Sequence, residues 1–190
     1  MAKKQDNKKK QIILAVFIVF LMSFSIMGII SRDNSSQVVR YGEYVFEKGA
    51  ANNWKTKIDD TVYEFTFHPD DVEQINISQD IIGKLKNSLE IDVTSDFDDK
   101  FKDGIALAQF NMQNTLKSKI YVRQGFTTNV SVAHPIILCN NTVVPTIYFK
   151  AGDDIIVYQE NNCIYAEGRS SRDFVEIADR LMYGILGIIG

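Results

Sequence analysis

The sequence of 190 residues is poor in cysteine, proline, histidine and tryptophan, with two, three, two and one of each. Two cysteines exclude a disulfide-dense scaffold, and their separation in the sequence excludes a C-x-x-C redox motif. The four cysteine and histidine residues match the ligand number of a zinc site, but not the spacing of any zinc motif. With 45% apolar residues, the chain is also unlike a disordered or low-complexity protein. One folded domain with an appendage is the expected organisation.

Positive charge is scarce outside the first residues. The formal net charge is −3, from 21 basic and 24 acidic residues. Five lysines and one acidic residue precede Gln11, so the rest of the chain carries 16 basic and 23 acidic residues, a net charge of −7. Such a domain repels a phosphate backbone, which excludes nucleic acid as its main partner.

One long apolar run is present near the start of the chain. No charged residue lies between Lys10 and Arg32, and residues 12–30 are long enough for a helix to cross the hydrocarbon core of a bilayer. The positive-inside rule predicts a cytoplasmic basic tail at residues 1–11, a polar linker at 31–37 and an extracytoplasmic domain at 38–190. A cleaved signal peptide is the alternative, although the run exceeds a usual h-region and no A-x-A site follows it.

The two cysteines and four N-x-S/T triplets are consistent with an oxidising compartment outside the cytoplasm. Cys139 and Cys163 form an even pair that predicts one disulfide, and two unpaired buried thiols are the alternative. The triplets begin at four asparagines that are candidate glycosylation sites, although a chain rich in asparagine also forms such triplets by chance. These asparagines are Asn34, Asn76, Asn129 and Asn140.

The alternation of strand-like and helix-like patterns predicts an α/β or α+β domain with a mixed sheet and flanking helices. Residues 152–154 and 160–162 are expected to form hairpins. Ser78 and Asp103 are expected to cap helices, with Asp103 immediately before the second of them. Strands are predicted at 41–47, 54–58, 61–67, 89–93, 119–123, 143–149, 155–159 and 163–167, and helices at 69–75, 78–88, 104–118 and 171–188.

The densest acidic group is a weak candidate for a cation site. Asp92, Asp96, Asp98 and Asp103 occupy spacings similar to those of a calcium loop. Phe97 stands where such a loop needs glycine, so a solvated loop is the simpler interpretation. No spacing in the sequence indicates a nucleophile with its base or a phosphate-binding loop, so we expect neither catalytic residues nor a cofactor.

The segment from Val144 to Gly152, VPTIYFKAG, resembles the thioredoxin strand that carries a cis-proline before a hairpin. The order of elements from Leu89 onward is also similar to a thioredoxin core. This resemblance implies a thioredoxin-like fold in the C-terminal half, with Pro145 as a candidate cis-proline. Residues 95–102, SDFDDKFK, replace the redox C-x-x-C of that family, so the resemblance implies a fold without its oxidoreductase chemistry.

Over its whole length the chain resembles small membrane-anchored archaeal proteins of unassigned function. The similar segments are residues 139–145, 162–164 and 179–184. We therefore expect a single-pass, non-catalytic binding or assembly module, whose partners are the lipid bilayer and another envelope protein or surface polymer. A thioredoxin-like thiol or redox accessory protein, using the two cysteines, is the alternative.

Overall fold

The structure is a computed structural model that describes residues 14, 16–18, 37–130, 134–140 and 142–190. Its contacts divide the chain into two units, Met1–Ser36 and Gln37–Gly190. In the first unit, Leu14 and residues 16–18 are helical and their side chains are exposed. Among the helices of the described residues, none has the length and apolar content needed to span a bilayer. Most of the predicted membrane segment, the basic tail, most of the linker and Asn34 lie outside the described residues.

The second unit begins with an antiparallel meander of four strands in the order β1-β2-β3-β4. Its strands are β1 (Val38–Tyr41), β2 (Tyr44–Lys48), β3 (Trp54–Ile58) and β4 (Thr61–Phe65). The single strand predicted at 41–47 is wrong, because Gly42 has a φ of +57° and turns the chain between β1 and β2. Asp59 and Asp60 also have positive φ, which is the geometry of a two-residue hairpin turn between β3 and β4.

The remaining strands form a mixed sheet in the order β6-β5-β7-β9-β8, which confirms the expected mixed sheet of an α/β or α+β domain. These strands are β5 (Glu90–Ser95), β6 (Tyr121–Phe126), β7 (Thr146–Ala151), β8 (Ile156–Glu160) and β9 (Cys163–Gly168). Only β8 runs antiparallel to its neighbour within this sheet. The hairpin predicted at 152–154 is wrong, because β7 pairs in parallel with β9 while β8 lies outside β9 at the edge.

Four helices accompany the sheets in the second unit, namely α2 (Pro69–Val72), α3 (Gln79–Lys86), α4 (Lys102–Leu116) and α5 (Ser171–Leu186). Ser78 caps α3 as predicted, since its hydroxyl accepts a hydrogen bond from the backbone of Ile81 at 3.4 Å. The prediction that Asp103 caps α4 is wrong. The N-cap is Phe101, and Asp103 lies in the first turn, where a carboxylate favours the positive end of the helix dipole.

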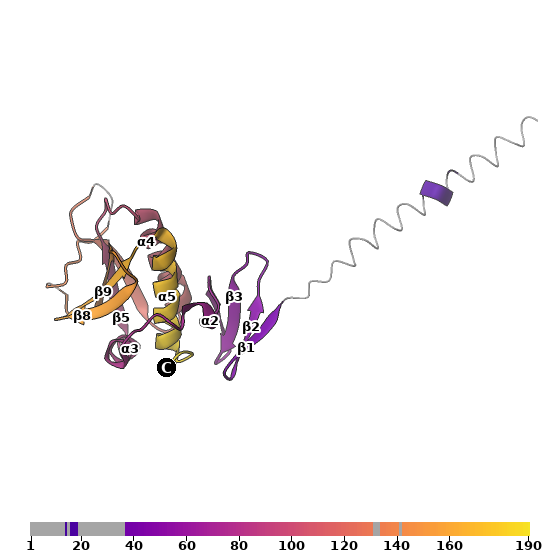
Figure 1. Cartoon of the computed structure of the whole chain (residues 1–190), viewed down its shortest axis with the longest axis horizontal. Helices are drawn as coiled ribbons and strands as arrows, with labels where there is room; N and C mark the ends of the chain where they lie inside the picture. The colour runs from indigo at the N-terminus through magenta and orange to yellow at the C-terminus, as the bar shows by residue number, and fades with distance from the viewer. Residues whose placement is uncertain (1–13, 15, 19–36, 131–133, 141) are drawn as a thin grey trace, which may run out of the picture. The chain divides into compact units, whose positions relative to one another are not determined.

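Helix α5 lies between the two sheets, so that the second unit has three layers (Figure 1). On one side, Tyr183 stacks on Phe65 of the meander with 4.1 Å between ring centroids. On the other side, Phe174 packs edge-to-face against Phe149 of β7 at 6.3 Å. Of the 16 residues of α5, 13 are buried, because a helix covered on both sides has almost no solvent face.

The predicted disulfide is present in the structure. Cys139 and Cys163 are bonded, and their Cα atoms are 5.2 Å apart. Cys139 belongs to the connection between β6 and β7, and Cys163 is the first residue of β9. The bond therefore fixes this long connection to the start of β9, which lies between β7 and the edge strand β8.

Candidate functional site

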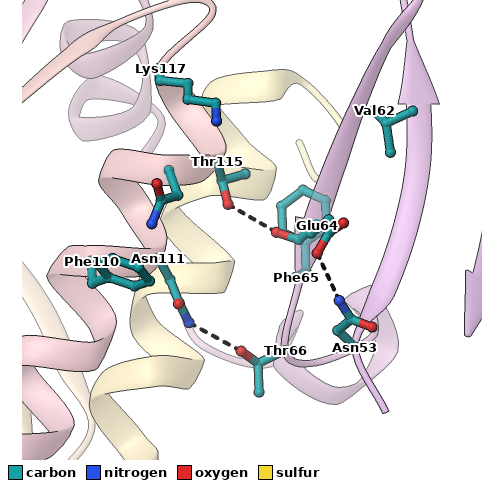
Figure 2. Close-up of a pocket in the computed structure, with 10 residues that line it drawn as sticks. Asn53, Val62, Glu64, Phe65, Thr66, Phe110, Asn111, Thr115 and Lys117 are labelled. Carbon is teal, nitrogen blue, oxygen red and sulfur yellow. Dashed lines mark hydrogen bonds between the residues drawn. The ribbon is translucent and has the colours of Figure 1, made fainter. Parts of the chain in front are cut away.

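A groove separates the free edge of the meander from helix α4 (Figure 2). We call it the β4–α4 groove. Its volume is about 460 Å³. Strand β4 supplies one wall because it is the last strand of its sheet, with β3 on one side only. The residues that define the groove are Asn53, Val62, Glu64, Phe110, Asn114 and Lys117.

Two hydrogen bonds from α4 hold one end of the β4–α4 groove together (Figure 2). The hydroxyl of Thr115 donates to the backbone carbonyl of Glu64 at 2.9 Å. The amide of Asn111 donates to the hydroxyl of Thr66 at 3.2 Å. The helix and the strand are therefore tied where β4 ends, and the groove between them is open toward Val62.

The ladder between β3 and β4 determines which backbone groups face the groove. Ile58 and Thr61 flank the two-residue turn, so they form a hydrogen-bonded pair, and such pairs recur at every second residue. Val62 and Glu64 occupy the alternate positions, and their N–H and C=O groups point away from β3. Thr115 occupies the carbonyl of Glu64. Within the described residues, the N–H of Glu64 and both backbone groups of Val62 have no protein partner.

The side chains of the groove combine exposed apolar groups with amides. Val62 is 58% and Phe110 57% exposed, and both are large apolar side chains that line this concave surface. The carboxylate of Glu64 lies 2.6 Å from Lys55 and accepts a hydrogen bond from Asn53 at 2.8 Å, so its charge is balanced within the meander. The groove thus presents little uncompensated negative charge in a domain that is acidic as a whole.

The four carboxylates of the candidate cation site do not converge. Asp92 is fully buried and pairs with Arg123 through two hydrogen bonds of 2.7 and 2.8 Å, which raises the pKa of the guanidinium. Asp96 accepts hydrogen bonds from Tyr148 at 2.8 Å and from Thr127. Asp98 and Asp103 are exposed. In the part of the chain that the structure describes, no three acidic, histidine or cysteine residues are grouped to hold a metal ion.

The remaining predicted site residues are dispersed over the second unit. Asn76, Asn129 and Asn140 are exposed, as an acceptor of a glycan must be. The prediction of a cis peptide bond at Pro145 is wrong, since every described peptide bond, including that of Pro145, is trans. This proline precedes the first residue of β7, and its carbonyl accepts a hydrogen bond from the backbone of Asp92 at 2.9 Å.

The two histidines have separate environments. His68 is buried, caps α2 and lies among the rings of Trp54 and Phe46, with centroids 4.8 and 5.1 Å away. His134 is exposed and packs edge-to-face on Phe126 at 5.5 Å. Neither histidine lies beside the disulfide, so the described residues assemble no zinc site from the four candidates.

Sequence reasoning missed the residues of the β4–α4 groove. The two-residue turn at Asp59 and Asp60 specifies which residues of β4 point outward, but nothing local in the sequence indicates that α4 lies across from them. No known protein family, curated protein or solved structure matches this chain.

Proposed function

We propose that this protein is a membrane-anchored, non-catalytic binding module whose globular domain works outside the cytoplasm. Support for this location comes from the uncharged apolar run at residues 12–30, from the five lysines before it, and from the disulfide between Cys139 and Cys163. The exposed positions of three N-x-S/T asparagines are compatible with it.

The observation that carries the binding function is the unpaired edge of β4 opposite α4. An extended peptide laid in the β4–α4 groove would pair with both backbone groups of Val62 and with the N–H of Glu64. Each backbone hydrogen bond adds roughly 1 kcal/mol, so pairing alone gives weak binding. Apolar contact with Val62 and Phe110, which are already exposed in the concave surface, supplies the remaining affinity. This is recognition by strand addition, with specificity from the side-chain pockets beside the strand.

The partner that fits this site is an extended segment of another envelope protein. The groove offers a strand edge, which pairs with a polypeptide backbone and has no comparable complement in a polysaccharide. Little negative charge remains uncompensated in it, and Lys117 stands at its open side. A neutral or acidic segment is therefore favoured over a basic one.

A redox accessory function is the second candidate, because the cysteines are joined in a disulfide. Cys163 is 1% exposed, so an external thiol has little access to its sulfur. Its buried place at the start of β9 suits a structural bond better than an exchanging one.

The test is site-specific photo-cross-linking of the full-length chain in its native membrane. We expect a cross-linker at position 110 to give a discrete adduct that mass spectrometry maps to an extended segment of one envelope protein. A cross-linker at Tyr121, an exposed aromatic position on the edge strand β6, is the matched control and gives no such adduct.

Two substitutions show whether the edge of β4 is responsible. Val62→Pro removes an outward N–H that β3 does not use, whereas Val62→Thr keeps it. The adduct is expected to disappear with proline and to persist with threonine. If Val62→Pro lowers the melting temperature strongly, Asn114→Trp replaces it, since a bulky side chain fills the groove from α4. An adduct that survives both blocking substitutions would refute the proposal.

A further inference from the structure

A second concavity lies at the carboxyl ends of β5 and β6, beside the first turns of α4. We call it the strand-end pocket; its walls include Asp96, Phe97, Gln109, Phe126 and His134, and its volume is about 250 Å³. The chain leaves β5 through α4 to reach β6 on one side, and later returns to β7 on the other side of β5. Ligands of open α/β sheets bind outside the carboxyl ends of the strands, which is the end of the sheet where this pocket lies.

Gln109 is the polar group that lacks a partner in this pocket. It is 5% exposed, and within the described residues its carboxamide Nε2 has no hydrogen-bond partner. An unpaired buried amide costs about 1–3 kcal/mol, so a natural core retains one where something else pairs with it. Gln113, one turn further along α4, contrasts with it, because that amide donates to the carbonyl of Val122 at 3.1 Å.

Aromatic rings form the apolar part of the pocket. Phe97 and Phe126 meet edge-to-face with 5.3 Å between centroids, and His134 also packs edge-to-face on Phe126 at 5.5 Å. Phe97 is nearly half exposed, so its ring is available to a ligand. A few polar groups placed among aromatic walls are typical of a site for a small organic ligand.

Charge and size limit which ligand the pocket takes. Its lining carries the carboxylates of Asp96 and Asp103 and the ammonium of Lys102, which disfavours an anion. The carboxylate of Asp96 already accepts hydrogen bonds from two hydroxyl groups, so it does not require a cation. A volume of about 250 Å³ lies below the ~300–1,000 Å³ of sites for drug-sized ligands and admits one small ring.

We propose that the strand-end pocket binds a neutral, hydroxyl-bearing ring of the size of one monosaccharide. A hydroxyl group both donates and accepts, so it can pair with either end of the Gln109 carboxamide. The apolar C–H face of such a ring packs on Phe97 and Phe126. This site shares no residue with the β4–α4 groove, so the proposal of a sugar ligand does not depend on the proposal of a peptide partner.

The test measures binding of four probes to the full-length chain in a detergent without a sugar headgroup. Glucose and N-acetylglucosamine are neutral, glucuronate is an anionic form of the same ring, and glucosamine at pH 6 is a cationic form. Saturation-transfer NMR is expected to show millimolar binding of at least one neutral sugar, and binding at least about tenfold weaker for both charged probes. Binding of neither neutral sugar, or tighter binding of a charged probe, would overturn the proposal.

Variants assign the binding to this pocket. Gln109→Leu is expected to weaken the neutral sugar about tenfold, as loss of one buried hydrogen bond implies, and to raise the melting temperature because it removes an unpaired amide. Gln79→Leu makes the same chemical change at an exposed position of α3, outside the pocket, and leaves sugar binding unchanged. If Gln109→Leu does not fold, Phe97→Ala, at an exposed position, is expected to lower the affinity severalfold. Unchanged affinity in the folded pocket variant would overturn the assignment.

Discussion

Asp179 is an acid buried at the junction between helix α5 and the meander, and its burial makes the stability of the domain depend on pH. One carboxylate oxygen accepts hydrogen bonds from the backbone N–H groups of Thr66 and Phe67, at 2.8 and 2.7 Å. The side chain is fully buried, and within the described residues its other oxygen has no partner. Burial raises the pKa of Asp179 to about 7, the two backbone hydrogen bonds oppose this effect, and the charge of Glu176 adds to it.

The sign of the pH effect follows from this raised pKa. Between the ordinary pKa of 3.8 and a folded-state pKa of about 7, the folded protein holds a proton at Asp179 that the unfolded chain releases. The contribution of Asp179 to stability is therefore complete below about pH 4 and is lost as the pH rises to about 7. At 1.36 kcal/mol for each pKa unit, this one group accounts for a loss of about 4 kcal/mol.

The substitution Asp179→Asn removes the titration and keeps an oxygen for the two backbone donors. We expect the free energy of unfolding of the variant, relative to the natural chain, to rise by about 4 kcal/mol from pH 4 to pH 8. Urea unfolding of both full-length proteins at several pH values measures this difference, in which the other titrating groups cancel.

Asp173→Asn is the matched control on the same helix. Burial alone would raise the pKa of Asp173, but hydrogen bonds from Ser170 and Arg169 lower it below its usual value. Its contribution to stability is therefore complete above about pH 4 and lost below that. Relative to the natural chain, this variant should change by less than about 1 kcal/mol between pH 4 and pH 8. A flat or falling profile for Asp179→Asn would refute the reasoning, because it would mean that the buried acid is stabilised in its ionised form.

Three further predictions concern the disulfide, the helix glycines and the membrane segment. Replacing Cys139 and Cys163 with serine should cost roughly 3 kcal/mol, measured by urea unfolding of oxidised and variant protein, and no loss would mean that the bond is not structural. Gly184→Ala should destabilise the protein by about 1–3 kcal/mol, because the added β-carbon would lie 2.5 Å from an isoleucine of α3. Gly83→Ala has open space around the new methyl group and should stabilise the protein by about 0.5–1 kcal/mol. Thermal unfolding that ranks the two variants the other way would contradict this packing. Residues 12–30 should keep the chain in the membrane pellet after alkaline extraction. Protease added to intact cells should cleave the domain at residues 38–190. A soluble chain with free thiols would exclude the proposed location.

Local sequence patterns predicted the individual helices and strands better than they predicted the order of the strands in the sheets. The alternation at residues 54–58 predicted β3 with its observed bounds, and the residues 160–162 do form the hairpin between β8 and β9. The expected hairpin at 152–154 failed because β9 takes the place beside β7, and strand order depends on contacts remote in sequence. The spacing of α5 indicated one buried face, but its two-sided cover explains why Asp179 and Arg180 are buried as well.

The sites were less accessible to sequence reasoning than the fold. The density of the acidic cluster around Asp96 predicted a weak cation site, yet its members pair with protein groups such as Tyr148 or face solvent separately. The β4–α4 groove and the strand-end pocket depend on α4 lying beside strands far from it in the sequence. Gln109 is one of two glutamines on α4, and within the described residues the lack of a partner for its amide is visible only once the helix is packed.

The central position of α5 also constrains how the chain matures. Every strand of both sheets precedes this helix in the sequence, yet Tyr183 and Phe174 complete the packing of each sheet. Until α5 has been synthesised and exported, the apolar faces of both sheets therefore stay exposed, and they are covered only when this helix packs between them. Chains truncated before residue 171 should therefore bind chaperones and proteases, whereas the full-length chain should not.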